Sequence, residues 1–218
     1  MCGRFTLTTR DVHDVARTLA AEVDRERAGL YRPRWNVTPT GDHWIVRLDA
    51  SGKRRMLPAR FGLELPGGRL VINARSETAA TLPSFSQAFA EGRCLVPADG
   101  FYEWEGGRSD RRPLWFHDPS GKLLTFAGLA IENCGALAFV ILTTAANDLL
   151  RPVHDRMPVL LSLEGAASWL ARPDPKLLAP APEGWLTGRE VSSRVNAVAN
   201  DGPELLEAPA PPRQLKFL

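Results

Sequence analysis

Two neighbouring stretches, Leu123–Ile131 (LLTFAGLAI) and Ala136–Thr144 (ALAFVILTT), decide the fold that we expect from the sequence. Both are short apolar runs bounded by turn residues, a pattern typical of buried strands. Ala136–Thr144 is the most apolar of all such runs, so we predict that it forms a central strand. Leu123–Ile131 is predicted to form a hairpin with Leu114–His117 across the turn at Asp118–Gly121.

Further short strands are predicted on both sides of these two runs. His43–Leu48 alternates between apolar and polar residues, and the Asp49–Gly52 turn after it predicts a return strand. The other predicted strands are an apolar run at Leu70–Asn73, two pieces within Arg93–Trp104 broken at Pro97–Gly100, and a late strand at Arg189–Ala199.

Helices are predicted to be few and scattered between these strands. Residues 9–27 have apolar side chains at the 3.6-residue period, and Thr8 or Thr9 is available as a cap. Shorter helices are expected over residues 83–91, 145–151 and 163–171. Many short strands with few helices predict an α+β single domain around an antiparallel, partly closed β-barrel-like sheet with peripheral helices. The domain is expected to span residues 1–206, followed by a proline-rich flexible tail over residues 207–218.

The composition of the 218 residues, with 44% apolar side chains, is that of a soluble globular domain. No apolar run is long enough to span a membrane, and no N-terminal signal is present, so a cytoplasmic and bacterial protein is expected. The three cysteines are odd in number and far apart, which fits a reducing compartment, and we expect Cys94 and Cys134 to be buried packing residues. No metal, no cofactor and a monomer are predicted. The net charge of +2 does not by itself predict a polyanionic partner.

Cys2 is the residue with the most unusual potential chemistry. A cytosolic aminopeptidase removes an initiator methionine that precedes a small side chain, which would leave Cys2 with a free α-amine beside its thiol. The amine condenses with an aldehyde to an imine, and the thiol then adds to the same carbon and closes a thiazolidine ring. Both groups have ordinary pKa values near 8, so both are partly nucleophilic at neutral pH. The second step is intramolecular and therefore fast. The alternative is that Cys2 is an inert residue in a mobile terminus.

Polar residues at the ends of apolar strands indicate where else chemistry could take place. Asn73–Glu77, Gly100–Trp104, Leu142–Ala145 and His154–Pro158 each place polar groups beside an apolar run. Each also has a purely structural interpretation: Asn73 as a helix cap, Glu103 as a solvent-facing strand residue, and His154 as a loop histidine. These motifs taken singly do not decide between the two.

The motifs taken together resemble those of the SRAP family, the SOS-response-associated peptidases or abasic-site-processing proteins. The resemblance rests on Met1–Phe5 (MCGRF), Trp35–Pro39 (WNVTP), Asn73–Thr78 (NARSET), Cys94–Trp104 (CLVPADGFYEW), Thr143–Ala145 (TTA), His154–Pro158 (HDRMP) and Val195–Asn196. These stretches follow the family's order over nearly the whole chain. The resemblance implies that the N-terminal cysteine captures abasic sites in single-stranded DNA as a thiazolidine, which protects the lesion during the response to DNA damage.

The resemblance also implies roles for individual residues. The implied catalytic residues are Cys2 as the nucleophile, Glu103 as the general acid and base, His154 as a second proton-transfer group, and Asn73 as a hydrogen-bonding partner of the amine. The implied DNA-binding residues are Arg4, Arg75 and Arg156 on phosphates, Thr143 on a phosphate or on the Cys2 backbone, Trp35 and Phe61 on bases, and Asn36 and Pro39 from the WNVTP motif.

The chain departs from the family's pattern in the segment Phe61–Gly68 (FGLELPGG). Members often have Trp-Gly and then Pro-x-Trp before the Asn-Ala-Arg motif, whereas here the aromatic residue after Pro66 is missing. The missing aromatic residue bears on how firmly the protein separates the DNA at the lesion. The reaction of Cys2 with the aldehyde does not depend on it.

Two other functions fit the same residues. A cysteine peptidase acting on other proteins, or one that removes its own Met1, could use Cys2 and His154. A non-catalytic single-strand binding module would hold intact DNA as persistently as abasic DNA. An alanine inserted between Met1 and Cys2 separates the first two functions, because thiazolidine formation needs the cysteine at the terminus and a peptidase acting on other proteins does not.

Overall fold

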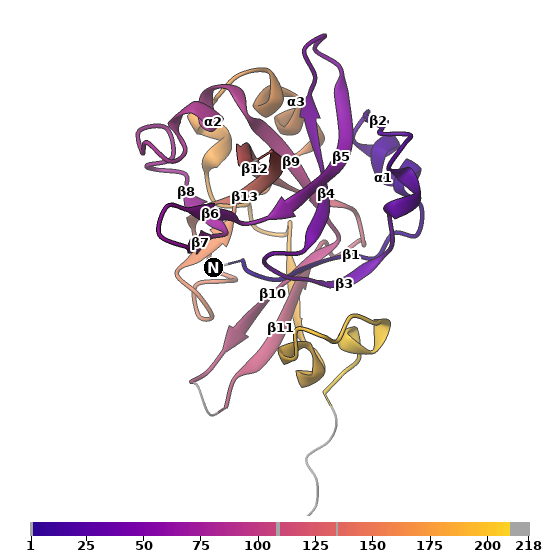
Figure 1. Ribbon diagram of the computed structural model, residues 1–218. Coiled ribbons are helices and arrows are strands. Elements are labelled where there is room, and N and C mark those ends of the chain that lie inside the picture. Colours follow the sequence, from indigo (N-terminus) through magenta and orange to yellow (C-terminus); the bar gives the residue numbers. More distant parts are fainter. Residues whose placement is uncertain (1, 108–109, 134, 210–218) are drawn as a thin grey trace, which may run out of the picture.

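A closed five-stranded barrel forms the centre of the computed structural model (Figure 1), which describes residues 2–107, 110–133 and 135–209. The barrel strands are β4 (Asp42–Leu48), β5 (Arg54–Phe61), β9 (Arg93–Ala98), β12 (Leu124–Asn133) and β13 (Ala136–Ala145). They pair in the order β13-β12-β9-β4-β5, and β5 pairs back to β13. All neighbours are antiparallel except the closing pair of β5 and β13, which is parallel. The predicted α+β fold is confirmed, and the barrel is closed.

The barrel strands are apolar on both faces because each face is buried. Successive side chains of a strand point to opposite sides. In β13, Phe139 and Ile141 therefore join one buried cluster while Val140 and Leu142 join the other. The first cluster fills the barrel, where Phe61 and Phe139 stack with ring centroids 5.1 Å apart. Other side chains of this interior cluster are Ile45, Cys94, Val96 and Phe126.

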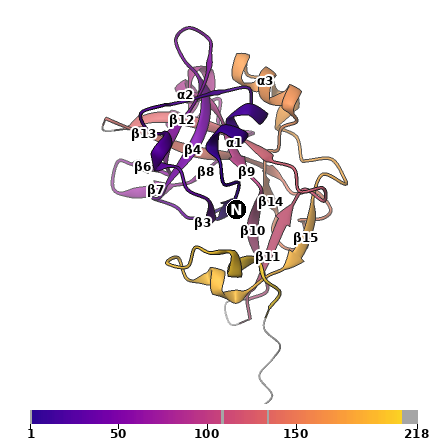
Figure 2. The ribbon, with the colours of Figure 1, turned by 90° about the vertical axis from the view of Figure 1, so that its right-hand side faces the viewer.

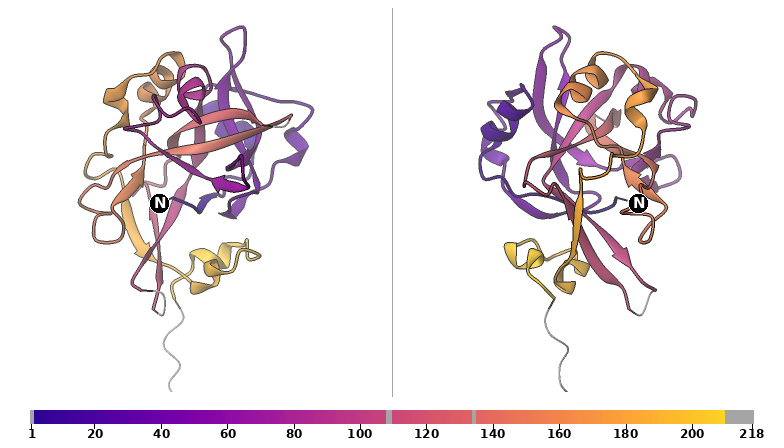
Figure 3. Two further views of the ribbon diagram at one scale, coloured as in Figure 1. Left: turned by 60° about the vertical axis from the view of Figure 1, so that its left-hand side comes forward. Right: turned by 180° about the vertical axis from the view of Figure 1, so that it is seen from behind.

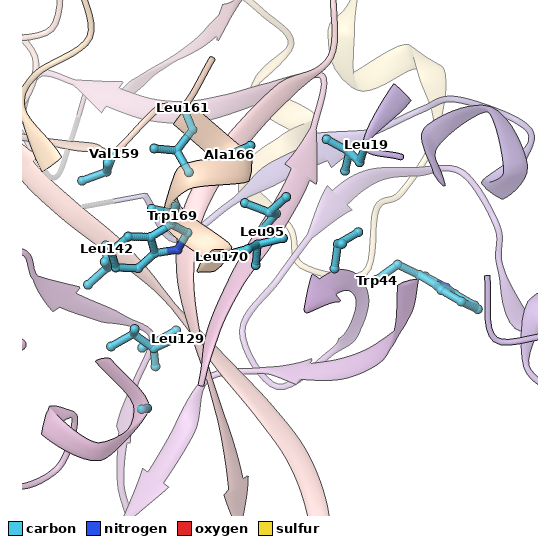
Figure 4. Close-up of a cluster of buried hydrophobic side chains, with 14 of the residues drawn as sticks. Leu19, Trp44, Leu95, Leu129, Leu142, Val159, Leu161, Ala166, Trp169 and Leu170 are labelled. Atoms are coloured by element: carbon cyan, nitrogen blue, oxygen red, sulfur yellow. The ribbon is translucent and has the colours of Figure 1, made fainter. Parts of the chain in front are cut away.

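The second cluster lies outside the barrel, under three short helices (Figure 4). These helices are α1 (Val12–Thr18), α2 (Ser86–Glu91) and α3 (Leu163–Ala171). Trp169 of α3 is fully buried and contacts Phe89 of α2 edge-on at 5.5 Å. Around them lie Leu95, Leu129 and Leu142 of the barrel wall.

The first helix is shorter than predicted and has a different cap. Its N-cap is Asp11, whose side chain accepts from the backbone N–H of His13, and the helix ends at Thr18. Ala20 has a positive φ of 49°, so the chain leaves the helical path there although the apolar period continues. The chain then forms β2 (Glu22–Val23) and a 3₁₀ turn, η1 (Ala28–Leu30).

A second sheet lies below the barrel in Figure 1 and has the order β15-β11-β10-β1-β3. Its strands are β1 (Phe5–Leu7), β3 (Arg34–Val37), β10 (Gly100–Glu105), β11 (Arg112–His117) and β15 (Thr187–Glu190). The predicted hairpin between Leu114–His117 and Leu123–Ile131 is therefore wrong. β11 pairs with β10 and β15, whereas β12 pairs with β9 and β13, because the turn between β11 and β12 carries the chain from one sheet to the other.

Several other boundaries also differ from the predictions. The run Leu70–Asn73 divides between two strands, the segment 145–151 contains turns in place of a helix, and the late strand ends at Glu190. The remaining elements are β6 (Leu63–Leu65), β7 (Arg69–Val71), β8 (Asn73–Arg75), β14 (Arg156–Pro158), η2 (Pro175–Leu178), η3 (Ser193–Asn196) and η4 (Pro203–Leu206). Met1, Cys134 and the predicted tail from residue 210 onward lie outside the described residues. None of the described helices is long and apolar enough to cross a membrane.

The beginning of the chain lies where the two sheets meet. Figure 2 shows the N-terminal end beside β3, β10 and β14, and the views in Figure 3 place it between the barrel and the C-terminal segment. Four segments that are far apart in the sequence therefore surround the first residues.

Candidate active site around the N-terminal cysteine

Cys2 has a fixed position because Phe5 anchors the start of the chain in the barrel. The Phe5 ring is fully buried and contacts His43, Phe61 and Phe126 edge-on, with centroids 4.7, 5.4 and 5.9 Å away. Cys2 lies only three residues earlier and is itself completely buried. The predicted nucleophile is thus held in the fold, which argues against an inert residue in a mobile terminus.

Strand pairing brings Glu103 close to the first residues. Phe5 is paired with Phe101, and the backbone N–H of Tyr102 donates to the carbonyl of Arg4 at 2.9 Å. The same antiparallel register, continued outward, places Gly3 opposite Glu103. Glu103 is 5% exposed. Burial, and next the negative charge of Glu103, raise the pKa of the Cys2 thiol, so the thiol is protonated at neutral pH beside a carboxylate.

Asn73 contacts Cys2 from another side. It lies on β8, which runs parallel to the end of β13 with Asn73 paired to Ile141. Its side-chain amide donates to the carbonyl oxygen of Cys2 at 3.2 Å. The Oδ1 atom of Asn73 is buried and accepts no hydrogen bond from any described residue. A buried acceptor of this kind is available to an N–H or O–H group that enters the site.

An open cleft of about 670 Å³ lies next to Cys2, with Gly3 and Glu103 among its lining residues. Its walls come from the first strand, the turn after β3, the end of β10, the segment before β14 and the segment that follows η3. The lining residues are Gly3, Arg4, Thr38, Pro39, Glu103, Trp104, Arg111, His154, Asn196 and Val198. Four of the residues predicted for the site thus line one cavity: Arg4, Pro39, Glu103 and His154.

His154 is placed at the cleft by hydrogen bonds that involve both its backbone and its ring. Its backbone N–H donates to Leu150 at 2.9 Å, and its Nδ1 accepts from the backbone N–H of Arg156 at 2.9 Å. In the neutral ring the proton is therefore on Nε2, which can donate. Nδ1 also lies 2.9 Å from a carboxylate oxygen of Asp155. These contacts fix the orientation of the His154 ring at the cleft.

Trp104 forms part of the cleft wall together with two arginines. The guanidinium carbons of Arg4 and Arg111 lie 5.7 and 5.6 Å from its ring, within the range of cation–π contacts. Its indole N–H donates to the side-chain oxygen of Asn196 at 2.7 Å. Arg4 donates to the carbonyl of Val195 at 2.6 Å. This wall carries two positive charges next to the single carboxylate of Glu103.

Arg156 and Arg75, two further predicted phosphate ligands, differ in their surroundings. Arg156 forms a bidentate ion pair with Glu77 at 2.6 and 2.8 Å and also donates to the carbonyl of Thr143. This ion pair lowers the pKa of Glu77. A phosphate at Arg156 would therefore compete with Glu77, whereas Arg75 at the end of β8 is exposed.

Three of the residues predicted to bind DNA are not on the cleft surface. Phe61 and Thr143 are fully buried, Phe61 inside the barrel and Thr143 with its hydroxyl toward the carbonyl of Ala74. Asn36 is also fully buried, and its side chain bonds the carbonyls of Ala197 and Asn200. Because all three are fully buried, none of them presents a surface for contact with DNA in this structure. Trp35 is half-buried and packs against a small cluster that includes Tyr102.

Six of the cleft residues received no site role from the sequence: Gly3, Thr38, Trp104, Arg111, Asn196 and Val198. Gly3, Thr38, Trp104 and Asn196 belong to the quoted motifs, so the signal was present. Arg111 and Val198 belong to none of the quoted motifs, and only the fold brings them to the cleft. Among the described residues, no group of three His, Cys, Asp or Glu side chains is arranged to share a metal ion.

Comparison with known proteins identifies the family of this chain. The sequence profile of the family described as SOS response associated peptidase (SRAP) matches residues 1–198. The chain belongs to the SRAP family. Abasic site processing protein YoqW of Bacillus subtilis is a SRAP relative that is 35% identical, over 95% of this chain and all of its own length. Abasic site processing protein YedK of Escherichia coli is 30% identical over 95% of this chain and 99% of its own.

Solved structures share the SRAP fold of this chain. A protein from Bordetella bronchiseptica is 27% identical and superposes with a TM-score of 0.70 over 88% of this chain and all of that one. A protein from Bacteroides thetaiotaomicron superposes with a TM-score of 0.78 over 95% of this chain and 99% of its own. Its identity of 19% supports the fold alone.

Proposed function

We propose that this protein processes abasic sites in single-stranded DNA and does so by covalent capture through Cys2. The observation that carries the proposal is the position of Cys2. Its carbonyl accepts a hydrogen bond from Asn73, and the charge of Glu103 raises the pKa of its thiol. The neighbouring Gly3 lines a cleft that also contains Arg4 and Arg111. Relatives that match nearly this whole chain are named abasic site processing proteins. The proposal requires the removal of Met1, so that Cys2 carries the free amine.

The proposed reaction joins the sugar to the protein and releases one water. The closed sugar of an abasic site first opens, as the proton of its C1 hydroxyl is removed and its ring oxygen gains one, to give the aldehyde. The amine of Cys2 attacks the aldehyde carbon to form a carbinolamine, which loses water to become a protonated imine. The thiol then adds to the imine carbon, and its proton passes to a base as the thiazolidine closes.

The residues around Cys2 supply what these steps need. Glu103 is the carboxylate beside the protonated thiol, so it is the proposed acceptor of the thiol proton and the base that opens the sugar. His154, with a donating Nε2 in its neutral form, is proposed to donate a hydrogen bond to the ring oxygen of the sugar, which takes the proton that Glu103 removes from the C1 hydroxyl. The buried Oδ1 of Asn73 is proposed to accept a hydrogen bond from the amine or the carbinolamine. Arg4, Arg75 and Arg156 are proposed to hold the flanking phosphates, with Arg156 exchanging Glu77 for phosphate.

A crosslinking experiment tests this function. The protein is mixed with a single-stranded oligonucleotide that carries one abasic site, and a denaturing gel is expected to show a stable adduct. Cys2→Ala should abolish the adduct, whereas Cys94→Ala, which removes the buried thiol in the barrel, should leave it. Glu103→Gln should slow formation about 100-fold or more, as expected for loss of a general acid and base. Glu105→Gln, two residues along the same strand and at an ion pair with Arg112, is the matched control.

Two further variants separate the other functions. Insertion of alanine between Met1 and Cys2 should stop crosslinking, and a peptidase that acts on other proteins should survive it. An oligonucleotide with a tetrahydrofuran analogue has no aldehyde, so it should bind reversibly and leave no adduct. An adduct with the analogue, or undiminished crosslinking by the insertion variant, would refute the proposal.

A further inference from the structure

A second cleft, of about 810 Å³, has Gly41 in its lining, two residues beyond Pro39 of the first cleft. In Figure 1, β3 and the start of β4 lie to the right of the N-terminal end. The walls of this cleft come from the segment before β3, the first residues of β4, the end of β5 and the start of β13. Its charged and aromatic lining residues are Arg27, Tyr31, Arg32, Arg34, Asp42, His43, Trp44 and Arg60.

This second cleft carries an excess of positive charge. Four arginines face a single carboxylate, that of Asp42. His43 adds no charge at neutral pH, because burial lowers its pKa to about 3. The groove beside α1 is a useful contrast, since its three arginines are matched by Glu22, Asp24 and Glu26. The second cleft is therefore suited to a polyanion and the groove beside α1 is not.

Two of its arginines remain available for a ligand. Arg34 is paired with Asp201, and Arg27 lies 3.7 Å from Asp24. Arg32 and Arg60 are exposed and form no ion pair with any other described residue. Free guanidinium groups of this kind can bind phosphate through two parallel hydrogen bonds.

The cleft also offers apolar surface beside these charges. Leu30 is 69% exposed at its edge. The Tyr31 ring is held in place by its hydroxyl, which donates to the carbonyl of Thr9 at 2.5 Å, and by an edge contact with Trp44. Positive charge next to fixed apolar and aromatic groups is the combination that binds the backbone and the bases of an unpaired strand. A duplex would use the charges and leave the apolar groups without a partner.

A short, well-fixed turn separates this cleft from the site of Cys2. Thr38 and Pro39 line the first cleft, and Gly41 lines the second. The backbone N–H of Gly41 donates to the carbonyl of Thr38 at 3.2 Å. At the end of β5, Phe61 accepts from the N–H of Thr40 and donates to the carbonyl of Gly41, both at 2.8 Å. A strand that leaves the first cleft over this turn therefore enters the second.

We propose that this second cleft binds the single-stranded DNA that continues from the abasic site on one side. The inference rests on the proposed function, because it assigns the path of the same DNA molecule. Arg32 and Arg60 bind phosphates of that strand, and Leu30 and Tyr31 contact its bases.

The length dependence of reversible binding tests the path. The probe is a labelled oligonucleotide with a tetrahydrofuran analogue, either short or extended with unpaired nucleotides on one side by about 8, a length that one single-strand binding fold covers. Extension on one of the two sides should tighten binding at least ~5-fold, as expected for added stacking contacts. The double variant Arg32→Ala, Arg60→Ala should lose most of that gain and bind the short probe as the wild type does. Its slope of log affinity against log salt should fall by about 1.4 for two lost phosphate contacts.

The control is the double variant Arg17→Ala, Arg25→Ala in the groove beside α1, which should keep the full gain. A gain that persists in the Arg32 and Arg60 variant, or no gain from either extension, overturns the inference. An equal gain from a duplex extension overturns the assignment to a single strand. Crosslinking of the short abasic oligonucleotide is measured in parallel. Its failure in the wild type would count against the proposed function, whereas the binding comparison needs no aldehyde and is judged separately.

Discussion

The side-chain amide of Asn73 donates a hydrogen bond to the backbone carbonyl oxygen of Cys2 across 3.2 Å. The two residues are 71 positions apart in the sequence, and the pairing of β8 with β13 gives Asn73 its place beside Cys2. This contact orients Cys2 without adding a charge next to Glu103. It explains why a residue so close to the terminus has one position in the fold.

Replacement of Asn73 by aspartate should separate DNA binding from the covalent step. The carboxylate would repel the Cys2 carbonyl and add a second negative charge near Glu103. Single-turnover crosslinking at saturating DNA is expected to slow about 10- to 100-fold, a loss of roughly 1.4–2.8 kcal/mol of transition-state stabilisation. The affinity for the tetrahydrofuran probe should change little. Equal losses in both measurements would show that Asn73 acts only on DNA binding or folding.

Asp99 is predicted to act as a positioning residue for the start of the chain. Its carboxylate accepts hydrogen bonds from the hydroxyls of Thr6 and Thr8 and from the backbone N–H of Thr8, which fixes β1 against β10. Asp99→Asn is expected to cost about 1–3 kcal/mol of unfolding free energy. It should also increase the reactivity of Cys2 toward a thiol reagent and slow crosslinking.

The matched control for Asp99 is Asp49→Asn. Asp49 accepts hydrogen bonds from Ser51 and Lys53 and pairs with Arg55 in a turn remote from Cys2. The Asp49→Asn variant is expected to have a changed free energy of unfolding in urea, with the same crosslinking rate and the same thiol reactivity of Cys2 as the wild type. If both variants slow crosslinking in proportion to their loss of stability, Asp99 has no positioning role.

Arg93 is predicted to stabilise the fold without any part in the chemistry. Its guanidinium donates to the carbonyls of Phe89 and Ala90 at the end of α2 and to those of Trp169 and Leu170 at the end of α3. It therefore satisfies the terminal carbonyls of two helices and balances their dipoles. Arg93→Met keeps the apolar stem and should lower the unfolding free energy by about 2 kcal/mol. Urea denaturation measures this loss, and crosslinking by the folded variant should equal that of the wild type.

The buried His43 predicts a loss of stability in mild acid. Burial lowers its pKa in the folded protein to about 3, below its ordinary value of 6.5. Between these two values the unfolded chain binds a proton that the folded chain does not, so stability falls as the pH drops from 6.5 toward 3. The slope is about 1.4 kcal/mol per pH unit for full protonation of the unfolded residue.

His43→Gln tests this pH dependence, because glutamine can still donate to the carbonyl of Pro97, which His43 contacts at 2.9 Å. Unfolding free energies of wild type and variant are compared between pH 6.5 and 5, above the range where most carboxylates titrate. The difference between the two proteins should shrink or reverse as the pH falls. A constant difference would show that the ring is protonated in the folded state.

Some of the fold followed directly from local sequence patterns. The apolar runs of β12 and β13, the alternation of β4 and the short helix α3 are set by side chains within each segment. The hairpin predicted between Leu114–His117 and Leu123–Ile131 was wrong because strand pairing depends on partners elsewhere in the chain, here β10 for the first strand and β9 for the second. The first helix was predicted too long because the apolar period continues past Thr18, whereas the backbone leaves the helical conformation at Ala20, which has a positive φ.

The candidate site divides in the same way. The motifs marked Cys2, Asn73, Glu103 and His154 as reactive or polar groups beside apolar strands, and their catalytic roles, implied by the resemblance of the motifs taken together, stay predictions. A motif does not show which of its side chains are exposed and which are buried. Phe61, Asn36 and Thr143 were therefore assigned to DNA, Thr143 with the Cys2 backbone as an alternative, although the fold buries them.

The sequence by itself determined which reactive groups the chain carries and which segments form strands, since both depend on side-chain type and local spacing. Only the tertiary structure decided that β5 closes the barrel onto β13, that Phe5 enters that barrel and holds Cys2 beside Asn73, and that Arg111 and Val198 reach the cleft. The physical reason is that these contacts join segments far apart in the chain. Their free energy depends on how whole faces of the barrel pack, and no local pattern records it.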